Sequence, residues 1–147
     1  MATRRKPQRA GKKTIEKRQQ PESLRLRSVS ASLTVTNLQK SLAWYRDVLR
    51  FTPGERWEED GAVRGVQLKA GGCDLMLNQD DFAKGHDRKK GEGFRIWVST
   101  TQDIDAIAAR VKATGWPLDR EPGPTPWGDR AFAVTDPDGF KITFIQE

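Results

Sequence analysis

The chain has 147 residues, of which 26 are Lys or Arg and 20 are Asp or Glu, so its formal net charge is +6. This length suits one domain with a core of its own. The sequence contains no run of about 18 apolar residues, so we predict no membrane span. No apolar stretch follows the N-terminal charges, as one would in a secretory signal. The single cysteine, Cys73, excludes an internal disulfide, and we expect a cytoplasmic protein.

The excess positive charge lies in residues 1–23. This segment holds eight Lys or Arg and two Glu, whereas the rest of the chain holds 18 residues of each sign. It has too few apolar residues to offset the entropy of ordering, so we predict a disordered basic arm. The arm is either a solubilising extension or a weak, non-specific contact for nucleic acid or anionic surfaces. No aromatic side chain interleaves its charges, so base stacking is not indicated.

The first half of the predicted domain, residues 24–80, favours one helix among four strands. A strand is predicted over residues 26–35, and Asn37 is a good N-cap for the helix that follows. The apolar face of this helix recurs at Leu38, Leu42, Tyr45 and Leu49, the spacing of an amphipathic helix. Three short strands separated by glycine turns are predicted over residues 51–57, 63–69 and 74–79.

The second half, residues 92–147, repeats this order. A strand is predicted over residues 94–98, with Thr100 as the N-cap of a second helix that Gly115 ends in a left-handed conformation. Further strands are predicted over residues 116–120, 130–135 and 140–145, the last two joined by the turn Asp136-Pro137-Asp138-Gly139. Matching segments of the two halves lie 63 to 65 residues apart. The sequence therefore predicts an α+β fold of two tandem βαβββ modules, whose curved sheets surround a cleft and carry the helices outside.

Five tryptophans are the candidates for either core packing or ligand contact. We predict that Trp44, Trp97 and Trp116 pack in the core. Trp57, near a strand end, and Trp127, in the Pro/Gly-rich loop 121–129, are candidate ligand contacts. Aromatic faces beside a concave sheet can stack on planar molecules.

Three patches of this sequence resemble the vicinal oxygen chelate superfamily, which groups glyoxalase I, extradiol dioxygenases and bleomycin-resistance-type binding proteins. The patches are the first helix from Ser41 to Phe51, the second helix from Asp103 to Gly115, and the turn at residues 136–140. The resemblance covers about residues 27–147. Arg50 departs from it, because the family usually has glycine there. A non-glycine residue in a left-handed position costs on the order of 1 kcal/mol.

The resemblance implies a metal site built from one inward-facing residue in each of four strands, typically His or Gln, Glu, His and Glu. Counted from the predicted helix starts and the turn glycines, these positions fall at Ser30, Met76, Gly93 and Thr143. None offers the imidazole or carboxylate that a divalent catalytic metal prefers, and a one-residue shift does not supply a set. We therefore expect no metal, no other cofactor and no catalytic residue. The sole histidine, His86, is expected to be solvated.

With the metal set missing, the resemblance implies a metal-free binding protein of the bleomycin-resistance type. Such a protein would be a homodimer that sequesters a planar aromatic drug or metabolite. The predicted ligand contacts are Ser30, Trp57, Met76, Asn78, Trp127 and Thr143. Bleomycin itself is disfavoured, because proteins that bind it tend to be acidic and this body is neutral. Two alternatives stay open: a metal-dependent lyase, isomerase or dioxygenase with ligands elsewhere, and a nucleic-acid-associated protein acting through the arm.

Overall fold

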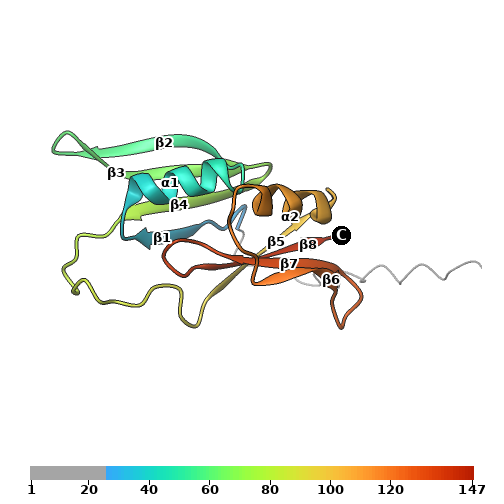
Figure 1. The fold of residues 1–147 in the computed structure, drawn as a ribbon. Coiled ribbons are helices and arrows are strands. Elements are labelled where there is room, and N and C mark those ends of the chain that lie inside the picture. The colour runs from blue at the N-terminus through green and yellow to red at the C-terminus, as the bar shows by residue number, and fades with distance from the viewer. Residues whose placement is uncertain (1–25) are drawn as a thin grey trace, which may run out of the picture.

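The protein folds as two successive modules, each with the element order β-α-β-β-β (Figure 1). The computed structural model describes residues 26–147, so the predicted basic arm lies outside the described residues. The predicted α+β fold of two βαβββ modules is confirmed. The elements of the first module are β1 (Ala31–Val35), α1 (Leu38–Asp47), β2 (Thr52–Glu59), β3 (Ala62–Ala70) and β4 (Cys73–Gln79), and those of the second are β5 (Arg95–Thr100), α2 (Ile104–Ala113), β6 (Arg120–Pro124), β7 (Arg130–Thr135) and β8 (Lys141–Gln146).

Each module forms its own four-stranded mixed sheet. The strand orders are β1-β4-β3-β2 and β5-β8-β7-β6, so the first strand of each module pairs with its last. That pairing is parallel in both modules, and the other pairings are antiparallel. The repeat seen in the sequence is therefore a repeat of the same topology.

Helix α1 has the predicted cap and the predicted buried face. The Oδ1 atom of Asn37 accepts a hydrogen bond from the backbone N–H of Lys40 at 3.1 Å, which satisfies one of the free N–H groups at the helix start. Beyond the helix, Arg50 has φ 68°, so this arginine adopts the left-handed conformation that the family usually gives to glycine. The four residues of the predicted apolar face, Leu38, Leu42, Tyr45 and Leu49, are all buried.

Three element boundaries differ from the prediction. Thr100 is the last residue of β5, and its Oγ1 accepts from the N–H of Gln102; the N-cap of α2 is Asp103. The polar run before this helix offers several capping side chains, and the sequence alone does not choose among them. Strand β1 begins at Ala31 and β6 at Arg120, both later than predicted. Gly115 has φ 88° after α2, as predicted.

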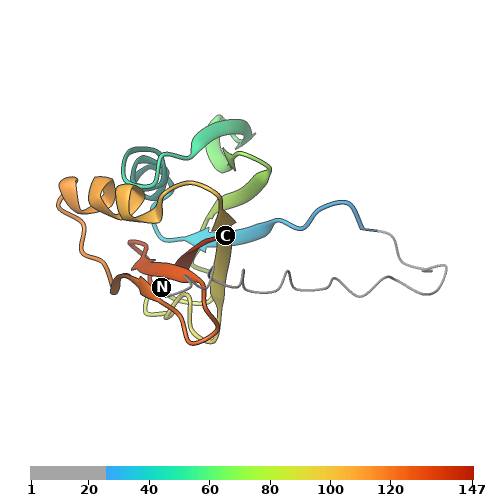
Figure 2. The same ribbon diagram turned by 90° about the vertical axis from the view of Figure 1, so that its right-hand side faces the viewer.

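One hydrophobic core runs through both modules. Helices α1 and α2 lie side by side on one face of the molecule in both ribbon views (Figures 1 and 2). Trp44 of α1 contacts Trp116 edge to face, with ring centroids 5.4 Å apart. Both residues pack as predicted, Trp44 being 6% exposed and Trp116 partly buried against the core.

The segment that joins the modules is held by a buried ion pair. The Nζ atom of Lys90 lies 2.7 Å from Oδ2 of Asp80, and the two side chains are 7% and 6% exposed. This hydrogen bond from Lys90 lowers the pKa of Asp80.

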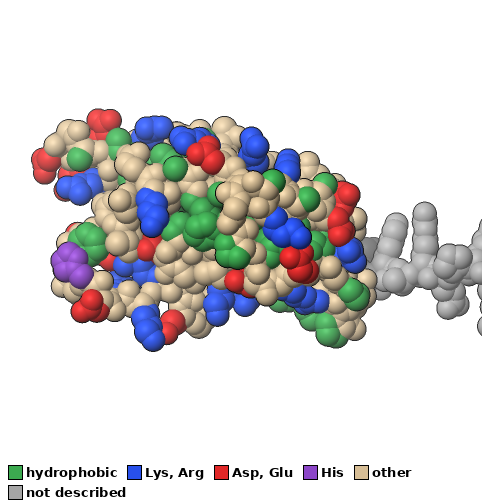
Figure 3. All heavy atoms as spheres, viewed as in Figure 1, with side chains coloured by type: hydrophobic (Ala, Val, Ile, Leu, Met, Phe, Trp, Pro, Cys, Tyr) green, Lys and Arg blue, Asp and Glu red, His purple; other side chains and the backbone are tan. Residues whose placement is uncertain are grey.

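On the face seen in Figure 3, basic and acidic side chains are interspersed, in keeping with a neutral body. No helix among residues 26–147 is long and apolar enough to cross a membrane.

Candidate functional site

The first module presents a partly polar sheet face opposite its helix. Because side chains alternate along a strand, the leucines of β4 point into the core while Met76 and Asn78 point to the other face. Trp57 lies over Gly65 on that face, since a Cβ atom at Gly65 would lie 2.9 Å from the Trp57 ring and 3.1 Å from Oδ1 of Asn78. The Nδ2 atom of Asn78 donates a hydrogen bond to Oγ of Ser32.

In the second module, the equivalent sheet face carries a cavity. A cavity of about 310 Å³ is lined by Arg95, Trp97, Asp119, Arg120, Thr125, Trp127, Ala131, Ala133 and Thr143. The rings of Trp97 and Trp127 stack with centroids 5.5 Å apart and an interplanar angle of 20°. They are 54% and 51% exposed, so the chain leaves a large aromatic surface open at this cavity.

The core position predicted for Trp97 was wrong. Its neighbours Ile96 and Val98 pack against the core, and the two-residue period of a strand then places Trp97 on the opposite face. Arg95 lies on the same face for the same reason. Neither residue was recognised as part of the site from the sequence, although the alternation from Arg95 to Ser99 carried the signal.

Arg95 is held in place by Thr143. Its Nη1 atom donates a hydrogen bond to the Thr143 hydroxyl at 3.0 Å. Thr143 is also the register partner of Trp97 on the neighbouring strand β8. The second module therefore brings a cation and two stacked indoles to one cavity, a combination of apolar surface and a few fixed polar groups that suits a small-molecule site.

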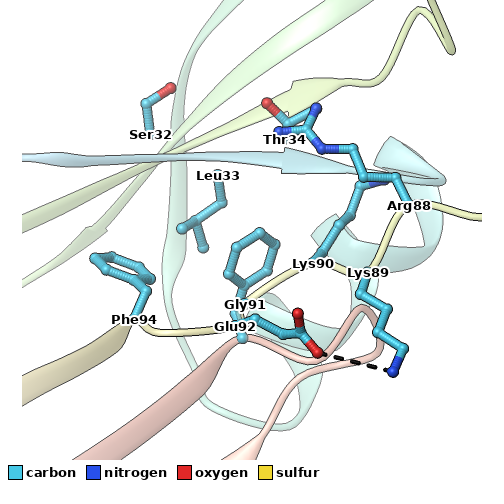
Figure 4. Close-up of a pocket in the computed structure, with 10 residues that line it drawn as sticks. Ser32, Leu33, Thr34, Arg88, Lys89, Lys90, Gly91, Glu92 and Phe94 are labelled. Atoms are coloured by element: carbon cyan, nitrogen blue, oxygen red, sulfur yellow. Dashed lines mark ion pairs between the residues drawn. The ribbon is translucent and has the colours of Figure 1, made fainter. Parts of the chain in front are cut away.

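Two other cavities lie where the modules meet. One, of about 360 Å³, lies between β1 and the connecting segment (Figure 4). Its lysines are already engaged, since Lys90 pairs with Asp80 and Lys89 lies 3.8 Å from Glu92. The other, of about 710 Å³, lies between the β3–β4 turn and the β5–α2 loop. In the described part of the chain, no stacked aromatic pair lines either of them, so the cavity at Trp97 and Trp127 is the strongest candidate site.

Comparison with known proteins places the fold and these motifs in a family. Residues 27–144 match the model of the Glyoxalase/Bleomycin resistance protein/Dioxygenase superfamily. The chain belongs to this superfamily. It is 30% identical over 121 residues to the lactoylglutathione lyase of Haemophilus influenzae, which covers 78% of this chain and 87% of that protein. It is 31% identical over 130 residues to the lactoylglutathione lyase of Neisseria meningitidis serogroup A, covering 83% and 91%.

Other proteins match this chain over shorter segments or by fold. The similarity to a lactoylglutathione lyase of Arabidopsis thaliana is 40% over 57 residues, which is 38% of this chain and only 20% of that protein. A superfamily structure from Sphaerobacter thermophilus superposes with a TM-score of 0.65 at 28% identity, covering 80% of this chain and 94% of that one. TioX from Micromonospora sp. superposes with a TM-score of 0.66 at 23% identity, covering 80% of this chain and 95% of that one. This similarity shows a shared fold.

Strand register corrects one of the four positions that the superfamily uses for metal. In the register of β1 and β4, Ser32 pairs with Met76. Ser30 is two residues before Ser32 in the chain and therefore lies two register positions before Met76. In the second module, Lys141 is two residues before Thr143, and its register partner is Arg95. Arg95 therefore occupies the position that Ser30 occupies in the first module. Gly93 lies in a turn before β5 with φ 68°. The prediction of Gly93 was counted seven residues back from Thr100, whereas the N-cap of α2 is Asp103 and lies eight residues after Arg95.

The side chains at these positions do not fit a divalent metal. They offer two hydroxyls, from Ser30 and Thr143, the thioether of Met76 and the guanidinium of Arg95. A guanidinium stays protonated and has no lone pair for a metal ion. Within residues 26–147, no three His, Cys, Asp or Glu side chains gather in a group that could hold a metal ion.

The predicted ligand contacts fall on two separate sheets. Trp127 and Thr143 line the cavity of the second module together with the unpredicted Arg95 and Trp97. Trp57, Met76 and Asn78 lie on the sheet face of the first module, and Ser30 is an exposed residue just before β1. The structure therefore joins only two of the six predicted residues in one cavity.

Proposed function

We propose that this protein binds an aromatic small molecule, without a metal, at the cavity of Trp97 and Trp127. The single observation that carries the proposal is the stacked, half-exposed tryptophan pair beside a cavity of about 310 Å³. Soluble chains rarely leave such rings open without a use, and indoles stack well on planar ligands. The unsuitable donor set at the superfamily's metal positions supports a binding role over metal-dependent catalysis.

We also propose that the protein acts as a homodimer. Trp57, Phe94, Trp97 and Trp127 are each between 40% and 54% exposed in the single chain. Several large apolar side chains exposed on one chain mark an interaction surface. Pairing of two chains would cover part of this surface and turn an open cavity into an enclosed one. Analytical ultracentrifugation at micromolar concentration tests this assembly, and a monomer at every concentration would contradict it.

The binding proposal is tested by isothermal titration with a panel of fused-ring aromatic compounds, charged and neutral. We expect at least one compound to bind saturably, with affinity reduced about fivefold or more by Trp127→Leu, because base or ring stacking on an indole contributes on the order of 1–3 kcal/mol. Trp57→Leu is the matched control, since Trp57 is an exposed tryptophan on the other sheet. Equal affinity in the wild type and Trp127→Leu would refute the assignment of this cavity.

A second candidate is the activity named for the relatives, lactoylglutathione lyase. Its support is the identity of about 30% over most of the chain to proteins of that name. Elemental analysis of the purified protein, followed by a lyase assay after addition of Zn²⁺ or Ni²⁺, separates the two candidates. Stoichiometric metal together with turnover would replace the binding proposal by an enzymatic one.

A further inference from the structure

Two cations stand side by side next to the tryptophan pair. Arg95 and Lys141 are register partners on the neighbouring strands β5 and β8, and both are exposed. Among residues 26–147, neither forms an ion pair with a carboxylate. Like charges directly opposite one another on a sheet repel, so a negative group placed between them would be stabilised by both.

The guanidinium of Arg95 is oriented and still has free donors. Its hydrogen bond to the Thr143 hydroxyl uses Nη1, one of several N–H groups in a planar fork. This fork matches the two oxygens of a carboxylate, and such charge-assisted pairs are stronger than neutral hydrogen bonds. Because Thr143 fixes one arm of the fork, less side-chain entropy is lost when the other arm binds.

The rest of the cavity adds aromatic surface and little opposing charge. Trp97 is two residues from Arg95 on the same strand, a Cα separation of about 6.6 Å, and Trp127 stacks on it. Asp119 is the one acidic residue that lines the cavity, and it accepts a hydrogen bond from Thr135. Arg120 also lines the cavity and donates to the carbonyl of Pro124 at 2.7 Å. The lining thus carries two arginines against one carboxylate.

We infer that this cavity selects planar aromatic carboxylates, with the rings against Trp97 and Trp127 and the carboxylate on Arg95. The inference rests on the proposed function, because it names the ligand class of the same site. By the repeat of the two modules, Arg95 occupies one of the four positions that correspond to metal ligands in the superfamily. The positive charge of its guanidinium would therefore face the ligand. A ligand whose acid group is attached directly to a fused ring suits this arrangement, because Arg95 and Trp97 lie two residues apart on the same face of β5.

The test compares 2-naphthoate with its neutral analogue 2-naphthamide by isothermal titration at the same ionic strength. We expect the wild-type protein to bind the carboxylate about tenfold tighter than the amide, the lower end of what hydrogen bonds to a charged group contribute, because Arg95 is exposed. Arg95→Gln should remove this preference, so that the variant binds the carboxylate and the amide with equal affinity. Arg110→Gln is the matched control, since it removes one exposed arginine from helix α2.

The outcomes separate the two proposals. If the wild type binds both compounds equally, the carboxylate inference is wrong and aromatic binding stands. If Arg95→Gln keeps the preference, another group recognises the acid and the inference is also overturned. If neither compound nor any other member of the aromatic panel binds, the proposed function itself fails. A preference lost in Arg95→Gln and kept in Arg110→Gln supports the inference.

Discussion

The hydroxyl of Tyr45 donates a hydrogen bond of 2.8 Å to Oδ2 of Asp136, and this contact joins the helix of the first module to the last turn of the second. Both groups are buried. The neighbouring Asp138 of the same turn accepts from the backbone N–H of Thr36, which lies between β1 and α1. Two of the sequence patches that resemble the superfamily are therefore in direct contact, and together they fix how the two modules pack.

Removing the tyrosine hydroxyl should destabilise the fold. In Tyr45→Phe, Oδ2 of Asp136 loses its donor while it stays buried, which costs about 1–2 kcal/mol in the free energy of unfolding. Urea denaturation measures this loss. Ser41→Ala is the control, because its Oγ lies 3.4 Å from Asp138 and makes a weaker contact to the same turn. An equal loss of unfolding free energy in both variants would show that the Tyr45–Asp136 hydrogen bond contributes no more than the weaker Ser41–Asp138 contact.

The stability of the protein should respond to the protonation of Asp136. Burial raises the pKa of this carboxyl above its usual value, although Phe140, Tyr45 and Asp138 donate hydrogen bonds that favour the charged form. The folded state therefore holds this proton more tightly than the unfolded state. Stability relative to an Asp136→Asn variant should fall as the pH rises from about 3.9, the unfolded value, through the raised folded pKa.

The asparagine variant keeps most of the local contacts, which makes this comparison possible. Its amide oxygen can accept from both backbone N–H groups, and its NH₂ can donate to the Tyr45 oxygen. Urea denaturation of both proteins across that pH window measures the difference. Asp138→Asn, which removes one negative charge from the same turn, is the control. A wild-type advantage that grows with rising pH would contradict the prediction.

Two glycines of the connecting segment should respond very differently to alanine. Gly91 and Gly93 have φ values of 78° and 68°, so each alanine meets about 1 kcal/mol of backbone strain. A Cβ atom at Gly91 would also lie 2.2 Å from the carbonyl oxygen of Gly139, whereas nothing lies within 4 Å at Gly93. We expect Gly91→Ala to lose about 3 kcal/mol or more and Gly93→Ala about 1 kcal/mol. Similar losses by thermal denaturation would show that the two chain segments can move apart at little cost.

Replacing Arg50 should stabilise the protein. Its φ of 68° is strained for any residue with a Cβ atom. Arg50→Gly removes the strain, and the greater freedom of glycine in the unfolded chain offsets part of the gain. We expect about 0.5–1 kcal/mol in the free energy of unfolding by urea denaturation. Arg110→Gly, in the interior of α2, should instead lose about 1 kcal/mol, and a loss in both variants would refute the explanation by strain.

Most of the fold could be predicted because its signals are local. The face of α1 follows from the spacing of Leu38, Leu42, Tyr45 and Leu49, and its cap follows from Asn37. The βαβββ repeat follows from matched segments 63 to 65 residues apart. The start of α2 could not be predicted in the same way, because Thr100, Thr101 and Asp103 all have side chains suited to capping. Which of them caps depends on where β5 ends, and pairing with β8 decides that.

The sequence by itself determined the topology of the modules, the buried helix faces and the family, since residue spacing and turn chemistry act over short stretches of chain. Only the tertiary structure decided the candidate site. The alternation along β5 already indicated that Trp97 and Arg95 share a face, but pairing with β8 brought Thr143 to Arg95, and the path of the loop before β7 brought Trp127 onto Trp97. Contacts between residues 30 and 48 positions apart in the chain depend on register and loop geometry, which no local pattern encodes.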